Sequence, residues 1–466
     1  MEAGALISEL KRRRVIRALI GYGIAAFAHE KGRAMRNAIC LVAVAFILGT
    51  SSAFSQPLPS VAPEKVGLSP ERLGRIGKAL NAEIEKGNIP GAVVLIARRG
   101  KVAYFDSFGF QDKGAGKRMT KDALFRVYSM TKPWVSVAAM QLVEEGRLVL
   151  TEPVSKFLPG FKGLQVSVPR ADPISGKLTY VMVPAEREPT IQDLLRHTSG
   201  LGYDFVTGNQ PVKEALVKAG LSALDPTFRD VSAADQVERL AKAPLAYQPG
   251  TTWEYSLATD VLGRVVEAVS GARLSQVVDE RVLKPLGMRD SGFMVPKDKL
   301  ARLAEPLPVD PATGQPSHAY DMSKVPVADS GGSGGVSSTS DYLRFAQMML
   351  NGGQLDGTRI LSRTTVALMT SDHLGQRIPA AVTPGELLMG VPGYTFGLGF
   401  MVRQGPGIAG VPGSTGEFMW AGALGTFFWV DPKEELVAVY MTQAGGPSRQ
   451  FYRRLIKDLV YQAIAD

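Results

Sequence analysis

The stretch that decides the fold is Phe125-Arg-Val-Tyr-Ser129-Met-Thr-Lys132-Pro-Trp-Val-Ser-Val-Ala-Ala-Met-Gln-Leu-Val-Glu-Glu-Gly146. After an apolar lead-in, apolar residues recur at helical spacing at Val135, Ala138, Ala139, Leu142 and Val143. Gly146 ends the pattern, so the stretch predicts an amphipathic helix. Ser129 and Lys132 stand three residues apart at its start, which makes them neighbours on one face.

This pair of side chains is suited to nucleophilic chemistry. A Ser hydroxyl is a poor nucleophile unless a base takes its proton, and a Lys amine can do so directly or lower the pKa of another base. The N-terminus of the helix adds unpaired N–H groups, which favour a developing oxyanion. The same short motif also occurs at Ser8-Glu-Leu-Lys11 in the leader, so the helix and the partners found further along the chain distinguish Ser129.

The chain has 466 residues, which is enough for two or three domains and a large core. Its formal charge of +9 is concentrated at the start, since residues 1–55 hold eight Lys/Arg and three Asp/Glu and the remainder has 45 basic and 41 acidic residues. No basic stripe argues for a nucleic-acid partner. The single cysteine, Cys40, lies in the leader, so no Cys-based metal site or disulfide is expected in the mature chain.

The leader ends in a secretory signal peptide. A charged start at Arg36 is followed by the apolar run 38–48 and by small residues before a cut expected after Ser55. Translation is expected to begin at Met35, with an uncleaved amphipathic anchor in residues 1–34 as the alternative. The sequence therefore predicts a periplasmic or secreted protein whose mature chain has no stable membrane insertion.

Strand patterns lie near both ends of the mature chain and helical patterns fill the middle. The patterns are a helix from Pro70, a hairpin turning at Arg99-Gly100, a strand over 394–402, strands at 425–430 and 436–442, and a closing helix over 448–465 with Phe451, Leu455, Leu459 and Val460 on one side. They predict an α+β fold, an antiparallel sheet flanked by the terminal helices plus an inserted helical domain. The expected domains are 56–124 together with 330–466 for the sheet, and 125–329 for the helices.

Two later stretches offer partners for Ser129. Tyr255, in Tyr255-Ser-Leu257, precedes a helical pattern, and its phenol, with a pKa lowered by a nearby Lys ammonium, would serve as base and proton relay. Trp420-Ala421-Gly422 is a Gly-containing strand entrance where backbone can approach a ligand and supply a second oxyanion N–H. Without these partners, Tyr255 and Trp420 would be read as packing residues.

Together, Ser-x-x-Lys, Tyr-Ser-Leu and Trp-Ala-Gly resemble the three motifs of serine β-lactamases and penicillin-binding proteins. The likeness covers roughly residues 60–466 and is strongest to the class C-related branch and its esterase relatives, the family VIII carboxylesterases. It implies a β-lactamase/transpeptidase-like fold, with Ser129 as the acylated nucleophile, Lys132 as its activator and Tyr255 as the base. It also implies an oxyanion hole made by the N–H groups of Ser129 and Ala423.

Two departures bear on the substrate. The resembled lactamases carry a polar group where Leu257 stands and Lys-Thr-Gly where Trp420-Ala421-Gly422 stands. Loss of that cation and addition of apolar surface favour neutral, hydrophobic, short-chain acyl or aryl esters over β-lactams. Efficient cephalosporin turnover would instead require an Arg or Lys outside the three motifs to bind the carboxylate.

The sequence also contains a competing nucleophile and a competing base. Gly331-Gly-Ser333-Gly-Gly335 fits the Gly-x-Ser-x-Gly elbow of α/β-hydrolases, with Asp341 and His373 following in the required order. The preceding segment is short and broken by proline, so Ser333 is interpreted as a glycine-turn residue. His197 stands alone, without a carboxylate at a readable spacing, and is interpreted as a structural loop histidine.

The sequence therefore predicts a secreted serine hydrolase that cleaves carboxylic esters through an acyl-enzyme on Ser129, with Lys132 and Tyr255 as the other catalytic residues. Trp420, Ala421, Gly422 and Leu257 are the expected substrate-binding residues. No cofactor or metal is expected, and the partner is a small-molecule ester or amide. The alternatives are a β-lactamase, a D-amino acid peptidase or amidase, and a penicillin-binding protein that is acylated without turnover.

Overall fold

The structure is a computed structural model that describes residues 58–466. The predicted leader, with its start at Met35 and its cleavage site after Ser55, lies outside the described residues. The described residues belong to one compact unit. A division of this unit into a sheet domain and a helical domain stays a prediction.

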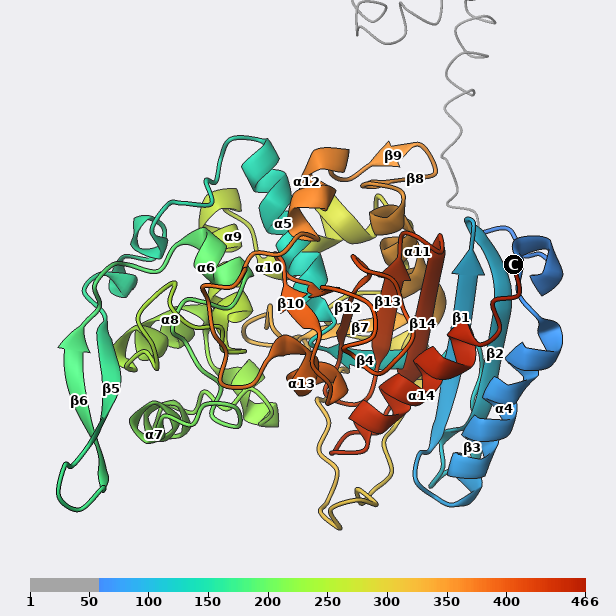
Figure 1. The fold of residues 1–466 in the computed structure, drawn as a ribbon, viewed down its shortest axis with the longest axis horizontal. Helices are drawn as coiled ribbons and strands as arrows, with labels where there is room; N and C mark the ends of the chain where they lie inside the picture. Colours follow the sequence, from blue (N-terminus) through green and yellow to red (C-terminus); the bar gives the residue numbers. More distant parts are fainter. Residues whose placement is uncertain (1–57) are drawn as a thin grey trace, which may run out of the picture. The chain divides into compact units, whose positions relative to one another are not determined.

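An eight-stranded antiparallel sheet forms one part of this unit, with strand order β10-β11-β12-β13-β14-β1-β2-β3 (Figure 1). Three further pairs of strands, β4–β7, β5–β6 and β8–β9, lie outside it. The strands are β1 Gly91–Arg98, β2 Lys101–Asp112, β3 Lys117–Arg118, β4 Leu124–Tyr128, β5 Gln165–Ala171, β6 Leu178–Pro184, β7 Gly335–Ser338, β8 Gln354–Leu355, β9 Thr358–Arg359, β10 Tyr394–Phe396, β11 Met401–Arg403, β12 Phe418–Ala421, β13 Phe427–Asp431 and β14 Leu436–Thr442.

The helices come mainly from the middle of the chain, with one at each end of the described part. They are α4 Pro70–Glu85, α5 Thr131–Glu144, α6 Ile191–Leu195, α7 Gln210–Lys218, α8 Ala233–Lys242, α9 Ala258–Ser270, α10 Leu274–Val278, α11 Thr339–Leu350, α12 Arg363–Met369, α13 Pro384–Met389 and α14 Arg449–Tyr461. Most begin at a Ser, Thr or Asn whose side chain accepts a bond from the first turn, and Thr190 and Asp193 form a full capping box at α6.

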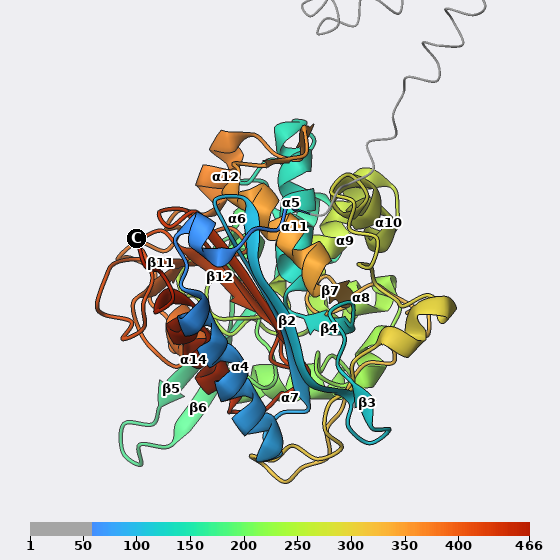
Figure 2. The same ribbon diagram turned by 90° about the vertical axis from the view of Figure 1, so that its right-hand side faces the viewer.

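The sheet joins strands from near the two ends of the described chain, as predicted. Strand β1 pairs with β2 on one side and with β14, more than 300 residues away, on the other; Val94 lies opposite Asp106 and Tyr440. The β1–β2 hairpin turns at Arg99 and Gly100, both with positive φ, which suits the right-handed twist of the strands. Helices α4 and α14 pack together on one face of the sheet (Figure 2).

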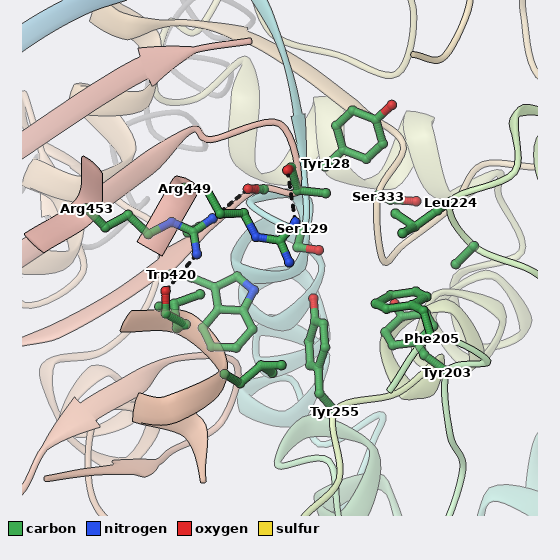
Figure 3. A pocket seen from close by; sticks show the side chains of 16 residues that line it. Tyr128, Ser129, Tyr203, Phe205, Leu224, Tyr255, Ser333, Trp420, Arg449 and Arg453 are labelled. Carbon is green, nitrogen blue, oxygen red and sulfur yellow. Dashed lines mark hydrogen bonds between the residues drawn. The ribbon is translucent and has the colours of Figure 1, made fainter. Parts of the chain in front are cut away.

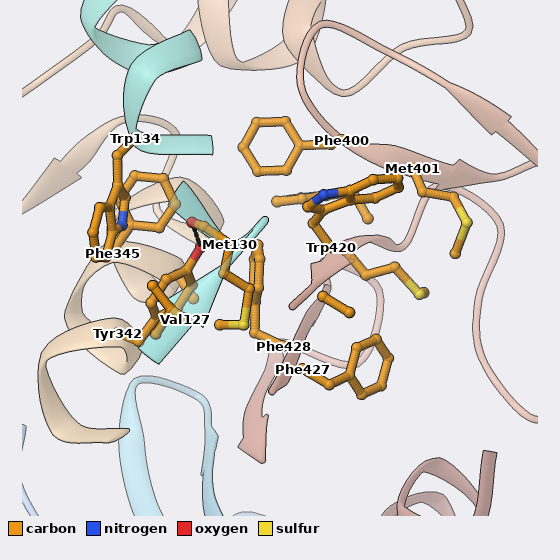
Figure 4. Packing of buried hydrophobic residues seen from close by; sticks show 14 of the residues in the cluster. Val127, Met130, Trp134, Tyr342, Phe345, Phe400, Met401, Trp420, Phe427 and Phe428 are labelled. Atoms are coloured by element: carbon orange, nitrogen blue, oxygen red, sulfur yellow. Dashed lines mark hydrogen bonds between the residues drawn. The ribbon is translucent and has the colours of Figure 1, made fainter. Parts of the chain in front are cut away.

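Helix α11 covers the opposite face and connects the sheet to the helical part of the chain. It packs against β1, β13 and β14, and its Tyr342 ring lies 4.8 Å from Phe428 of β13. On its other side the Tyr342 hydroxyl donates to the Met130 carbonyl at 2.7 Å, just before α5 (Figure 4). This layer of buried aromatic rings fixes the start of α5 relative to the sheet.

Helix α5 differs from the prediction in its surroundings. It begins at Thr131, two residues after Ser129, and most of its residues are buried, including Lys132 and Ser136. The helix is therefore enclosed on nearly all sides and is not an amphipathic surface helix. The short side chains Ala138 and Ala139 allow close packing against neighbours such as α9.

Helix α14 also differs from its prediction. Phe451 is 48% exposed, whereas Tyr452, Ile456 and Val460 are buried. The helix presents long basic side chains to the interior as well, and Lys457 donates to the fully buried Glu417 at 2.7 Å. The buried face is therefore about one residue out of register with the predicted one, although Val460 belongs to both, and the apolar stems of basic residues form part of it.

The predicted strand over 394–402 is two strands, β10 and β11, joined by a turn in which Gly399 has φ 93°. A Cβ added there would lie 2.4 Å from the Ser136 hydroxyl of α5, so a glycine is required at this approach.

Among the described residues, no helix is both long and apolar enough to cross a membrane.

Candidate active site

Ser129 follows a strained residue at the end of β4. Tyr128 has φ 43°, a conformation that bulky residues avoid and that persists only where the surroundings enforce it. Its ring stacks on Tyr320 at 4.8 Å, and the Thr131 hydroxyl donates to its carbonyl at 2.5 Å. The partly exposed Ser129 is thereby held at the turn between β4 and α5.

Lys132 lies directly behind Ser129. Its Nζ atom is 3.4 Å from Ser129 Oγ, and it donates to the Tyr203 hydroxyl at 3.1 Å and to the Gly332 carbonyl at 2.7 Å. The side chain is 1% exposed. Burial lowers the pKa of Lys132 to about 7, although the charge of Asp260 opposes the shift. A substantial share of this amine is therefore neutral near pH 7 and able to accept a proton.

The turn before β7 is held by Asp260 of α9. One carboxylate oxygen of Asp260 accepts from the Ser330 hydroxyl at 2.6 Å and from the Gly332 backbone N–H at 3.0 Å. The carbonyl of the same residue, Gly332, accepts a hydrogen bond from Lys132 Nζ. Asp260 thus acts on Lys132 both by its charge and by placing this carbonyl.

Ser333 belongs to this turn, as predicted. Its hydroxyl is paired with those of Tyr320 and Ser330 at 3.1 and 2.9 Å. The proposed elbow partners have other roles: Asp341 accepts from the Asp290 backbone N–H, and the His373 ring contacts the Leu368 carbonyl. The three residues of an α/β-hydrolase triad are not assembled around Ser333.

Tyr255 lies in the loop before α9, with its hydroxyl beside Ser129 and the Trp420 indole N–H. Its ring is 4.6 Å from Lys132 Nζ, a cation–π arrangement. The expected lowering of its pKa is wrong, because burial raises the pKa of Tyr255 more than its polar neighbours lower it. The phenol is therefore protonated near neutral pH, and the group with the lowered pKa is Lys132.

His197 is a structural residue, as predicted. It is buried with φ 58°, its Nδ1 lies 3.1 Å from the Ser256 hydroxyl, and its ring packs on Tyr255 at 5.0 Å. Burial holds the pKa of His197 well below its ordinary value. The neutral ring supports the loop that carries Tyr255.

Two residues that line the pocket, Ser129 and Ala423, have backbone N–H groups available to a ligand. Within the described part of the chain, neither the N–H of Ser129 nor that of Ala423 donates a hydrogen bond. The two lie close because the end of β12 approaches the end of β4, where the Thr426 hydroxyl is 3.4 Å from the Val127 carbonyl. This arrangement can stabilise an oxyanion formed by attack of Ser129.

A pocket opens over Ser129 and has two unlike walls (Figure 3). Phe205 and Leu224 form an apolar rim on the helical side, and both are more than 40% exposed. The sheet side is formed by Trp420, Ala421, Gly422 and Ala423 together with Arg449 and Arg453. The predicted substrate residue Leu257 does not line this pocket, because it caps α9 and is completely buried.

Sequence reasoning missed several residues of the site. Tyr203 belongs to no motif, although its hydroxyl accepts a hydrogen bond from Lys132. Arg449 and Arg453 lie on α14, four residues apart, a spacing that would have placed them on one face. No group of three or more His, Cys, Asp or Glu able to hold a metal occurs among the described residues.

A serine beside a buried lysine, under a pocket with two free N–H groups, defines a serine hydrolase. The chain matches the Beta-lactamase family over residues 76–461, and it belongs to that family. It is 33% identical over 389 residues to Esterase EstB of Burkholderia gladioli, covering 79% of this chain and 89% of that protein. It is 35% identical over 370 residues to Protein Rv1367c of Mycobacterium tuberculosis, covering 77% and 87%.

The fold is shared with solved structures as well. The hydrolase EstCE1, described as having promiscuous acyltransferase activity, superposes with a TM-score of 0.67 at 28% identity, over 84% of this chain and 99% of that one. These similarities confirm the predicted family, the antiparallel-sheet α+β fold and a serine hydrolase with esterase relatives.

Proposed function

We propose that this protein hydrolyses carboxylic esters through a covalent acyl-enzyme on Ser129. The observation that carries the proposal is the buried Lys132 amine, 3.4 Å from the hydroxyl of Ser129, which lines the pocket. The relative named as an esterase, EstB, supports the ester as substrate. The apolar rim at Phe205 and Leu224 fits a hydrophobic acyl or alcohol group.

In the acylation step, Ser129 Oγ attacks the ester carbonyl carbon while its proton passes to the neutral Lys132 amine. The carbonyl oxygen becomes an oxyanion that accepts from the N–H groups of Ser129 and Ala423. The bond to the leaving alcohol then breaks, and the alcohol oxygen takes a proton. Tyr255, whose hydroxyl lies between the nucleophile and Trp420, relays that proton from Lys132.

Deacylation reverses these roles. A water molecule attacks the acyl carbon and gives one proton to Lys132, directly or through the Tyr255 hydroxyl. The second tetrahedral intermediate collapses with cleavage of the bond to Ser129 Oγ, which recovers the proton. The products are a carboxylic acid and the alcohol, and the enzyme returns to its starting state.

A second candidate is hydrolysis or trapping of β-lactams, or cleavage of D-amino acid peptides. Relatives at 26% identity, from Salmonella, are named putative D-alanyl-D-alanine carboxypeptidases. Arg449, which lines the pocket, is the observation in favour, since such substrates carry a carboxylate. Against it stands Trp420, whose indole offers only an N–H in place of a cation.

We also propose that the protein is exported, with cleavage after Ser55 and a mature chain starting near Gln56. N-terminal sequencing of the protein recovered from its producing cell tests this. An intact segment 1–34 on the active protein would favour the anchor instead.

Parallel assays with a chromogenic ester and a chromogenic cephalosporin test the reaction. Steady turnover of the ester supports an esterase, and a stoichiometric burst alone indicates a binding protein. Mass spectrometry after reaction with a covalent serine inhibitor identifies the labelled residue, which is expected to be Ser129. Label on Ser333 would contradict the mechanism.

A further inference from the structure

Two arginines on α14 donate hydrogen bonds to the backbone around Ala423, whose N–H is the second proposed oxyanion donor. Arg453 donates to the Gly422 carbonyl at 2.8 Å and to the Leu388 carbonyl of α13 at 2.7 Å. Arg449, one turn earlier, donates to the Ala423 carbonyl at 3.3 Å. Two consecutive carbonyls at the end of β12 are therefore each bonded to a guanidinium group (Figure 3).

Arg453 has no acidic partner to explain its burial. It is 2% exposed, and in the described part of the chain no carboxylate lies within 4.0 Å of it. A buried cation that is paired only with carbonyl groups is costly compared with an apolar side chain of similar size. A methionine would fill this space at lower cost, so packing alone does not account for the arginine.

The geometry of one peptide unit connects Arg453 to the reaction. The carbonyl of Gly422 and the N–H of Ala423 belong to the same planar trans peptide, so they point in opposite directions. Because the Gly422 carbonyl is fixed on Arg453 and on the Gly425 backbone N–H, the Ala423 N–H points away from Arg453, and Ala423 lines the same pocket as Ser129. A cation on the carbonyl also polarises the peptide and makes its N–H a stronger donor.

We propose that Arg453 is a positioning residue of the oxyanion hole, which orients and polarises the Gly422–Ala423 peptide and acts on the reaction through that peptide. The inference rests on the proposed attack by Ser129 on a carbonyl. Arg453 should therefore stabilise the tetrahedral intermediate more than it stabilises the bound ester, because the Ala423 N–H is needed most when the oxyanion develops.

The test compares Arg453→Met with Arg453→Lys and with a control on the same helix, Arg454→Met. Arg454 bonds the Met389 carbonyl and does not line the pocket. The readouts are kcat and KM for p-nitrophenyl butyrate and the inhibition constant of phenylboronic acid, which forms a tetrahedral adduct with a reactive serine. Thermal unfolding reports on the fold of each variant.

Arg453→Met is expected to lower kcat roughly ten- to a hundredfold and to weaken phenylboronic acid by a similar factor, while KM changes less than about threefold. Arg453→Lys is expected to recover part of both losses, since an ammonium can bond one of the two carbonyls. Arg454→Met is expected to keep the wild-type constants. Wild-type kcat and inhibition in folded Arg453→Met, or equal losses in KM and kcat, would overturn the proposal.

If Arg453→Met does not fold, Arg453→Lys decides the matter. A change of kcat and of the inhibition constant together by at least about threefold supports positioning, and unchanged constants refute it. Binding of phenylboronic acid to Ser129 needs no turnover, so it tests the positioning role of Arg453 separately from the proposed ester hydrolysis. A protein that binds the boronic acid in an Arg453-dependent way but cleaves no ester contradicts the ester hydrolysis and leaves the positioning role supported.

Discussion

A Cβ atom on Gly422 would lie 2.4 Å from the carbonyl oxygen of Val127. Gly422 directly follows β12 and Val127 is the second-last residue of β4, so the missing side chain allows the two strand ends to meet at the site. Ser129 follows Val127 by two residues, and Ala423 follows Gly422 directly. The close approach therefore brings the two oxyanion N–H groups together from opposite ends of the described chain.

Gly422→Ala is expected to separate these strands and to lower kcat/KM for an ester at least about a hundredfold, the loss typical of a damaged oxyanion hole. Steady-state kinetics on the folded variant measure this. Gly405→Ala is the matched control, since a Cβ there meets nothing within 4 Å. Similar kinetics for the two variants would show that the approach of Gly422 to Val127 is not needed.

Ser129→Ala and Lys132→Ala are each expected to reduce turnover by on the order of a thousandfold or more, because the two residues act as one unit. Ser333→Ala is expected to retain most of the activity, since within the described chain its hydroxyl is bonded to those of Tyr320 and Ser330 and not to Ser129 or Lys132. The rates of the three purified variants settle the identity of the nucleophile. Loss of activity in Ser333→Ala, with Ser129→Ala active, would reverse the assignment.

The pH dependence of kcat/KM should report the pKa of Lys132. Because burial lowers its pKa to about 7 and the neutral amine is the base, kcat/KM is expected to rise with pH through about 7. Asp260 raises the Lys132 pKa, so Asp260→Asn should move this limb to lower pH. The asparagine oxygen can still accept from Ser330 and Gly332. A limb that stays in place, or moves upward, would contradict Lys132 as the base.

Tyr255→Phe keeps the ring and removes only the hydroxyl, so the fold should survive. Loss of the proton relay is expected to lower kcat by roughly two to four orders of magnitude. Since the pKa of Tyr255 is raised and not lowered, the acidic limb near pH 7 should persist in this variant. Ordinary rates would mean that the ring only packs against Lys132 and Trp420.

The sequence motifs predicted the residues that occur in local patterns. Ser129 and Lys132 share one turn, and Tyr255 precedes α9, so short motifs pointed to residues that lie together in the structure. Trp420 also lines the pocket, but it lies near the end of β12 and not at the predicted strand entrance. The sheet joining β1 and β14 was also predictable, because strand patterns lie near both ends of the mature chain. These features depend on near neighbours and on hydrophobic period.

The residues that tune the site were not predictable in the same way. Tyr203, Asp260 and Arg453 act on the nucleophile, the base or the oxyanion hole through contacts made only in the folded chain. The direction of the Tyr255 pKa was wrong because it depends on burial, which competes with the nearby Lys132 charge. Leu257 was misplaced because a motif position does not reveal which way a side chain points.

The pocket contains a positive charge that the three sequence motifs did not predict. Trp420 removes the cation of the Lys-Thr-Gly strand, but Arg449 lines the same wall of the pocket, with no carboxylate within 4.0 Å in the described chain. It is a partly exposed residue, and one of its nitrogens bonds the Ala423 carbonyl. Arg449 is thus the cation outside the three motifs that an anionic substrate would meet.

The last prediction concerns this choice between neutral and anionic substrates. We expect kcat/KM for p-nitrophenyl butyrate to exceed that for a cephalosporin, because the apolar rim at Phe205 and Leu224 suits simple acyl groups. A charge-assisted bond is worth about 1.5–3 kcal/mol, or roughly ten- to a hundredfold. The test compares kcat/KM for p-nitrophenyl butyrate carrying a carboxylate on its ring with kcat/KM for the plain ester. Arg449→Gln should lower the ratio of the first value to the second by this factor. The control Arg454→Gln should leave the ratio unchanged. An unaltered ratio in Arg449→Gln would show that Arg449 serves only the backbone of Ala423, and faster cephalosporin than ester turnover would make the protein a β-lactamase.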